Sequence, residues 1–284
     1  QYAMLCSKVC TMKFAAAVYP SGFKVKQGHL RSKAQQGFTL VELMISMTLG
    51  LILLLIIGTA FVSSRQAFRE QEDNARIQES GRFALEFIGR NIKQAGHAEV
   101  PFGGIKAEFE GTAIRGTSGA AGVADTVTIQ YDGAIGDQDC EGAGFTAADI
   151  TAQNIVIQNS FNIDATNAEL RCDGQFVAAL TEPVPTSGSV LLENVEDLQL
   201  LYGIDTTGEQ SVDQYVAAPA VPADWGRVIA VRVCVLIRSD KTNIVSPGYY
   251  LDCNGTSVAI PADRRLRRAF TATFNLRNRV NIQP

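Results

Sequence analysis

The feature that most constrains this chain is a long apolar run with one carboxylate at its edge. Directly after Glu42, residues 43–62 (LMISMTLGLILLLIIGTAFV) contain no charged side chain. An apolar segment of about 18 residues or more is typical of a membrane-spanning helix. A carboxylate at the centre of such a helix costs about 2.5 to 3.5 kcal/mol, and less toward its ends. Glu42 is therefore expected to have a partner or a specific role.

Charge is distributed unevenly along the chain. Residues 1–37 carry six basic side chains and no acidic one, which leaves 19 basic and 29 acidic residues in 38–284. A basic flank ahead of an apolar run predicts a cytoplasmic N-terminus and an exported remainder. Since nucleic-acid binding needs a basic surface, the acidic remainder does not favour that function.

Two ordinary interpretations of residues 1–62 are a cleaved secretory signal and a plain membrane anchor. The apolar run is longer than the core of a signal peptide, which is about 7 to 15 residues, and no small-residue cleavage site follows it. A plain anchor stays open, although it gives Glu42 no role. The sequence starts with Gln1, and we take Met12 as the start of the natural chain, with residues 1–11 outside it.

The segment from Gly37 to Glu42 reads GFTLVE and leads directly into the apolar run. It resembles the prepilin signature of type IV pilins and type II secretion pseudopilins. The resemblance implies that a membrane peptidase removes the leader 1–37 by cutting after Gly37 and methylates the new amine of Phe38. It also implies that Glu42 neutralises the Phe38 amine of an adjacent subunit, an attraction that apolar surroundings strengthen. The alternative is a glutamate that only reaches the lipid headgroups.

Three later segments resemble the PilW family of minor pilins, and they occur in that family's order. They are ENVEDLQLLYGID at 193–205, WGRVIAVRVCVLIRSD at 225–240 and DRRLRRAFTATFNLRNRV at 263–280. A J-type pseudopilin of a type II secretion system has the same kind of N-terminus and a similar plan. It remains open as an alternative.

The helical pattern continues beyond the apolar run. After Val62, apolar residues recur mostly three and four positions apart as far as Ala95, with charged residues between them, as an amphipathic helix requires. Gly96 then offers a C-cap, and Pro101 prevents continuation. We expect one helix with a transmembrane or filament-core half over 38–62 and an amphipathic half over 63–96.

A period-two pattern with glycine-rich turns predicts a periplasmic β-rich domain over 97–284. The strongest strand candidates are 227–238 and 268–277. Weaker candidates are 123–131, 154–158, 175–180 and 189–192, and the expected loops are 102–122 and 133–148. A helix first and strands afterward predicts an α+β, pilin-like fold, with the long N-terminal helix packed on an antiparallel sheet.

Two charged stretches lie in this domain. Residues 193–197 (ENVED) are acidic, and a basic cluster follows later: Arg264, Arg265, Arg267 and Arg268. We predict that both are solvated surfaces. The alternative is that the arginines contact the acidic stretch or a neighbouring subunit, where charge would set register more than affinity.

The mature part of the chain holds an even number of cysteines, which predicts disulfides in an exported protein. They are Cys140, Cys172, Cys234 and Cys253, whereas Cys6 and Cys10 fall in the leader or ahead of it. Of three possible pairings we favour Cys140–Cys172 with Cys234–Cys253, which closes the shortest loops at about 3 kcal/mol each. The wide spacings and the absence of a C-x-x-C do not favour zinc.

No motif indicates catalysis. His97 is the single histidine after the leader and is expected at a helix end or on the surface. No G-x-S-x-G elbow or nucleotide-binding glycine loop occurs in its required context. Asp137, Asp139 and Glu141 lack the spacing of an EF-hand, so we interpret them as a polar loop. We therefore expect no enzymatic activity, no metal and no cofactor.

The resemblance implies a minor pilin that primes assembly of a type IV pilus and is incorporated near its tip, with roles in adhesion and twitching motility. The implied partners are other minor pilins, the major pilin, the prepilin peptidase, the inner-membrane assembly platform and a tip adhesin. Before assembly the protein would lie in the inner membrane as a single-pass protein with a periplasmic domain, and afterwards in the pilus. A membrane-anchored periplasmic enzyme is the more distant alternative.

Overall fold

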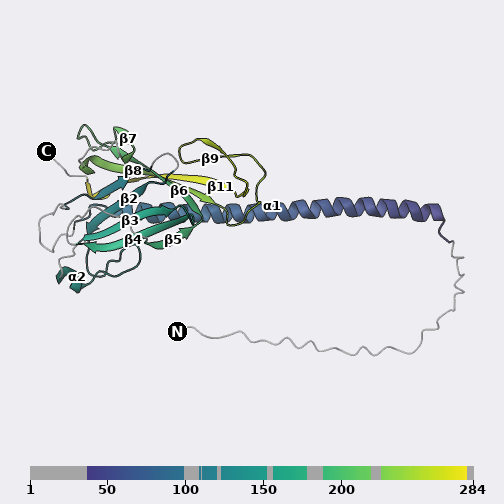
Figure 1. The fold of residues 1–284 in the computed structure, drawn as a ribbon, viewed down its shortest axis with the longest axis horizontal. Coiled ribbons are helices and arrows are strands. Elements are labelled where there is room, and N and C mark those ends of the chain that lie inside the picture. The colour runs from purple at the N-terminus through teal and green to yellow at the C-terminus, as the bar shows by residue number, and fades with distance from the viewer. Residues whose placement is uncertain are drawn as a thin grey trace, which may run out of the picture. The chain divides into compact units, whose positions relative to one another are not determined.

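The computed structural model describes residues 37–98, 109, 111–119, 123–151, 156–177, 188–218 and 225–279. The expected leader up to residue 36, with its cysteines and Met12, lies outside the described residues, as do Pro101 and most of the 102–122 loop. One long helix comes first and strands follow it (Figure 1), which confirms the expected α+β class.

The helix α1 (Leu40–Gln94) is continuous over 55 residues. It extends across two compact units of the chain, which divide between Ile56 and Ile57. In the first unit every described residue is exposed, whereas in the second unit a stripe of α1 is buried at mostly helical spacing: Asp73, Ile77, Gly81, Ala84, Ile88, Gly89, Asn91 and Ile92.

The end of α1 follows the glycine signal in the sequence. Gly96 has a φ of +69°, in the left-handed region that glycine adopts without strain. Its N–H donates to the carbonyl of Gln130 at 2.9 Å, so the helix end is joined directly to a strand.

Two antiparallel sheets contain most of the strands. The first sheet is a meander in sequence order: β1 (Ile114–Thr117), β2 (Thr126–Asp132), β3 (Val156–Asp164), β4 (Glu169–Val177) and β5 (Ser189–Glu193). The second has the order β11-β8-β6-β7, from β6 (Val195–Ile204), β7 (Gln214–Val216), β8 (Val228–Arg238) and β11 (Arg267–Asn275). A hairpin pairs β9 (Tyr249–Leu251) with β10 (Ser257–Ala259), and the short helical segments are α2 (Ala147–Thr151), η2 (Trp225–Arg227) and η3 (Arg277–Arg279).

The strand predictions succeed where the pattern is strong and miss several of the described strands, which are β1, β6, β7, β9 and β10. The two strongest candidates are β8 and β11, which pair with each other from Arg238–Arg267 to Ala230–Asn275. Strand β6 is not predicted, because its acidic start suggests a solvated turn or a sheet edge, and the strands form two sheets where a single one is expected. The expected loop 102–122 contains β1, and the expected loop 133–148 contains the start of α2.

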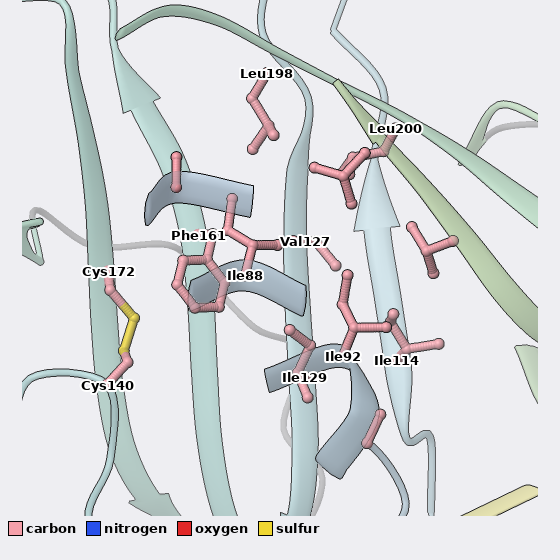
Figure 2. Close-up of a cluster of buried hydrophobic side chains, with 14 of the residues drawn as sticks. Ile88, Ile92, Ile114, Val127, Ile129, Cys140, Phe161, Cys172, Leu198 and Leu200 are labelled. Carbon is pink, nitrogen blue, oxygen red and sulfur yellow. A yellow bond between two sulfur atoms is a disulfide. The ribbon is translucent and has the colours of Figure 1, made fainter. Parts of the chain in front are cut away.

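The hydrophobic core lies where the buried stripe of α1 meets both sheets. Figure 2 shows Ile88 and Ile92 of α1 beside Val127 and Ile129 of β2 and Phe161 of β3. From the second sheet, β6 contributes Leu198 and Leu200 to the same cluster. Burial of these side chains, at about 1.5 to 3 kcal/mol each, is the main force that holds the helix against the strands.

Glycines on α1 let β11 approach closely. A Cβ on Gly81 would overlap the ring of Phe270, and a Cβ on Gly89 would overlap the ring of Phe274. The eight residues of α1 from Gly81 to Gly89 span about 12 Å, and the four residues of β11 from Phe270 to Phe274 span about 13 Å. The spacing of the two glycines therefore matches the spacing of the two rings. These two contacts together set the position of β11 along the axis of α1.

Candidate processing and assembly site

The first turn of α1 contains the residues that the prepilin signature singles out. Gly37 and Phe38 precede the helix, and Thr39 caps it, since its Oγ1 accepts the N–H of Glu42 at 3.2 Å. Thr39 and Glu42 stand at the two positions of a capping box. This T-x-x-E signal is legible in the sequence.

Glu42 therefore has one local reason to occupy its position. A carboxylate in the first turn interacts favourably with the positive end of the helix dipole, by about 0.3 to 1 kcal/mol. Within the described part of the chain no basic side chain forms an ion pair with Glu42. Its charge remains available to a group from another molecule.

Within the part of the chain that the structure describes, no side chain covers the apolar surface that follows Glu42. Among the described residues, α1 is the one helix long and apolar enough to cross a membrane, and none of its most apolar 18-residue window is buried. Phe38 at the start of this surface is 81% exposed, and Leu55 is 68% exposed. An apolar surface of this extent requires lipid or neighbouring chains.

At the other end of α1, an amide network joins the helix to the first sheet. Asn159 of β3 donates to Oδ1 of Asn91 at 2.7 Å, and its own Oδ1 accepts the N–H of Cys140 at 3.0 Å. The same Asn159 amide donates to the hydroxyl of Tyr131 at 3.4 Å. Burial raises the pKa of Tyr131 to about 12, so the phenol stays protonated at neutral pH.

The basic cluster is not simply solvated, and the prediction of two solvated faces is wrong at Arg267. This guanidinium is 4% exposed and forms bidentate pairs with Glu196, at 2.7 and 2.8 Å, and with Asp263, at 3.0 and 2.7 Å. Arg238 of β8 also contacts Glu196, at 3.3 Å. A buried arginine needs charged partners. The alternative prediction, that the acidic and basic stretches contact each other, is therefore confirmed at Arg267 and Glu196.

The ion pairs shift the pKa values of this cluster. Hydrogen bonds from Arg267 hold the pKa of Asp263 at about 2, well below its ordinary value. Burial by itself lowers the pKa of Arg267, but the hydrogen bonds to Asp263 and Glu196 outweigh it and raise that pKa. Asp263 and Arg267 are therefore charged at neutral pH.

The structure contains the neighbour pairing of cysteines that the sequence favours. Cys140 is bonded to Cys172 of β4, with Cα atoms 6.2 Å apart, and Figure 2 shows this bond beside the core. Cys234 of β8 is bonded to Cys253 after β9, with Cα atoms 5.7 Å apart. The first bond holds the 133–146 loop on the first sheet, and the second holds the β9–β10 hairpin on the second sheet.

The three loop carboxylates cap backbone groups. Asp137 accepts the N–H of Ala134, and Asp139 accepts those of Glu141 and Ala143. Glu141 reaches the N–H groups of two further residues, Gly174 and Ser189. Among the described residues no group of three or more histidine, cysteine or carboxylate side chains could hold a metal ion. His97, exposed at the end of α1, uses its backbone to bond Gln94 and Asp132.

Comparisons with known proteins find matches for the N-terminal segment and for the strand-rich domain. Residues 158–278 match the model of the PilW family, described as type IV pilus-assembly protein W, and residues 32–58 match the prokaryotic N-terminal methylation motif. These matches confirm the resemblance found in the sequence. Among solved structures, a type IV-like pilin from Thermus thermophilus matches over 72% of this chain and 98% of that chain, with 15% identity and a TM-score of 0.47. No curated protein sequence matches this chain.

Proposed function

We propose that this chain, with its PilW-type domain and prepilin-type N-terminus, is a minor pilin that primes assembly of a type IV pilus and is incorporated near its tip. The observation that carries the proposal is the exposed apolar half of α1, which starts at a methylation motif and continues into a PilW-type domain. Such a helix suits lipid before assembly and neighbouring helices after it.

The chemistry of assembly would begin with the processing of the N-terminus. The prepilin peptidase cuts after Gly37 and methylates the amine of Phe38, which then lies in the residues directly ahead of α1. The Thr39 cap fixes the first turn, and Glu42 one turn into the helix offers a carboxylate to the Phe38 amine of an adjacent subunit. In apolar surroundings an unpaired carboxylate is penalised, so this pairing selects ordered subunit contacts.

The proposal specifies location and partners. The chain waits in the inner membrane through the apolar half of α1, with the PilW-type domain in the periplasm. It then joins other minor pilins and the major pilin through the inner-membrane assembly platform, with a tip adhesin as a further partner. No catalytic role is assigned to any residue.

A J-type pseudopilin of a type II secretion system is the second candidate, since a methylation motif at 32–58 suits both machines. Deleting the gene separates them. Loss of surface pili with secretion intact supports the minor pilin, whereas loss of secretion with pili intact supports the pseudopilin.

The primary test is intact mass and N-terminal sequencing of the protein from its native membrane. An N-methylated Phe38 with a mass four hydrogens below that of the reduced chain is expected from processing and two disulfides. Complementation of the deletion strain with Glu42→Ala should lower the number of pili at least tenfold, whereas the matched surface variant Glu86→Ala should restore them. An unprocessed N-terminus, or full piliation with Glu42→Ala, would overturn the proposal.

A further inference from the structure

A carboxylate of α1 is buried without a complete set of partners. Asp73 is 2% exposed, and its Oδ2 accepts no hydrogen bond. It is the first residue of the buried stripe of α1 and is followed one turn later by Ile77. A buried carboxylate oxygen without a hydrogen-bond partner is destabilising, so such a group calls for an explanation outside the monomer's own packing.

Asp73 lines an open groove between α1 and the ends of two strands. The groove has a volume of about 800 Å³ and is bounded by α1 over 73–80, by β5 with the turn after it, and by the end of β8 with the residues that follow. Val190 and Leu192 supply apolar walls, and Val190 is 45% exposed. Asp73 is one of the residues that line this groove and is buried.

The groove has an excess of negative charge. Four carboxylates line it, which are Asp73, Glu79, Glu193 and Asp240, and of these Glu79 pairs with Arg82 at 3.6 Å. The cations that line it are Arg76 and Arg238, and each already pairs with a carboxylate outside the groove, Glu72 at 3.0 Å and Glu196 at 3.3 Å. A cation from another molecule would therefore meet little competition at Asp73.

We propose that this groove is a docking site for a basic segment of a neighbouring pilin subunit, with a lysine or arginine side chain that reaches Asp73. The aliphatic stem of a long basic side chain can contact the apolar walls while its charged end reaches Asp73. Charge complementarity of this kind selects one neighbour and one register. The inference rests on the proposed function, because it supposes that the chain assembles with other pilins.

The test uses the full chain in the piliated cell. A photo-crosslinking amino acid at Val190, an exposed wall of the groove, is expected to link to a different subunit that carries a prepilin signature, at a peptide that contains lysine or arginine. Asp73→Asn keeps the shape of the side chain and removes its charge, and it should lower this crosslink at least fivefold. The matched control Glu86→Gln, on an exposed face of α1, should leave the crosslink unchanged.

Stability measurements separate docking from folding. Asp73→Asn should leave the Tm of the purified full chain unchanged or higher, because it removes an unpaired buried charge. Replacing the crosslinked basic residue of the neighbour with aspartate and Asp73 with lysine should restore the crosslink. A lower Tm for Asp73→Asn with an unchanged crosslink, or a crosslink only to a second copy of this chain, would overturn the inference. If the crosslink is absent while Glu42→Ala still abolishes pili, docking at the groove is contradicted and the proposed function is unaffected.

Discussion

Arg267 and Glu196 are 71 residues apart in the sequence and form a bidentate ion pair, with Nε 2.7 Å and Nη2 2.8 Å from the two carboxylate oxygens. The pair joins the first residue of β11 to the start of β6, across the intervening strand β8. Arg238 of β8 reaches the same carboxylate, so three neighbouring strands of the second sheet share one charge cluster around the buried guanidinium of Arg267.

Removing the guanidinium should destabilise the domain strongly. Arg267→Met keeps much of the side-chain volume but leaves Asp263 without its main partner and Glu196 with Arg238 alone. We expect a loss of about 3 kcal/mol in the free energy of unfolding, measured with urea at neutral pH, as for other broken buried pairs. The matched control Arg268→Met, at an exposed neighbouring position, should change it by less than about 0.5 kcal/mol. Equal effects of the two variants would contradict a special role for Arg267.

The same cluster predicts a dependence of stability on pH. The folded pKa of Asp263 is about 2, below its unfolded value. The stability that Asp263 contributes is therefore fully present above about pH 4 and is lost as pH falls toward 2. Asp263→Asn should lower the free energy of unfolding at pH 7 by about 1 to 2 kcal/mol and flatten its fall between pH 4 and 2. Parallel pH profiles for the two proteins would show that Asp263 is not the group responsible.

A methyl group at Gly89 should destabilise the domain although alanine favours helix. The new Cβ would overlap the ring of Phe274, and overpacking of this kind costs about 1 to 3 kcal/mol. Chemical unfolding of Gly89→Ala should show this loss, and the double variant Gly89→Ala with Phe274→Leu should recover part of it. The control Gln78→Ala, on an exposed face of α1, should be neutral or slightly stabilising. A neutral Gly89→Ala would mean that β11 does not lie tightly against α1.

Each disulfide should stabilise the domain by about 3 kcal/mol. The loops that they close separate the cysteines by 32 and 19 residues, so the paired serine variants of Cys140 with Cys172 and of Cys234 with Cys253 should both lower the free energy of unfolding, the first slightly more. Titration of free thiols in the denatured, processed chain, which lacks Cys6 and Cys10, should detect none in the wild type. Removing Cys140 alone should expose one reactive thiol at Cys172, and a thiol at Cys234 instead would contradict the pairing.

Local patterns in the sequence predict the parts of this structure that depend on local forces. The run from Leu43 to Val62 and the stripe that ends near Ala95 predict α1, and Gly96 predicts its end. Strong β-branched alternation predicts β8 and β11. Loop length favours one of the three cysteine pairings, and the structure contains that pairing, Cys140–Cys172 with Cys234–Cys253.

The sequence fails where a residue's role is set by contacts far along the chain. The acidic start of β6 reads as a turn, since nothing local shows that Glu196 will meet Arg267. Asp73 reads as one more charge on an amphipathic helix, since its burial depends on strands more than a hundred residues later.

The sequence by itself determined the membrane-length helix, its processing motif and the strand-rich domain, because periodicity, charge and glycine act over a few neighbouring residues. Only the tertiary structure decided that two sheets, not one, flank the helix, that Gly81 and Gly89 admit two phenyl rings, and that Arg267 and Asp73 are buried. These outcomes depend on shape and charge matched between distant segments, and the free energy of such matches appears only when the chain has brought those segments together.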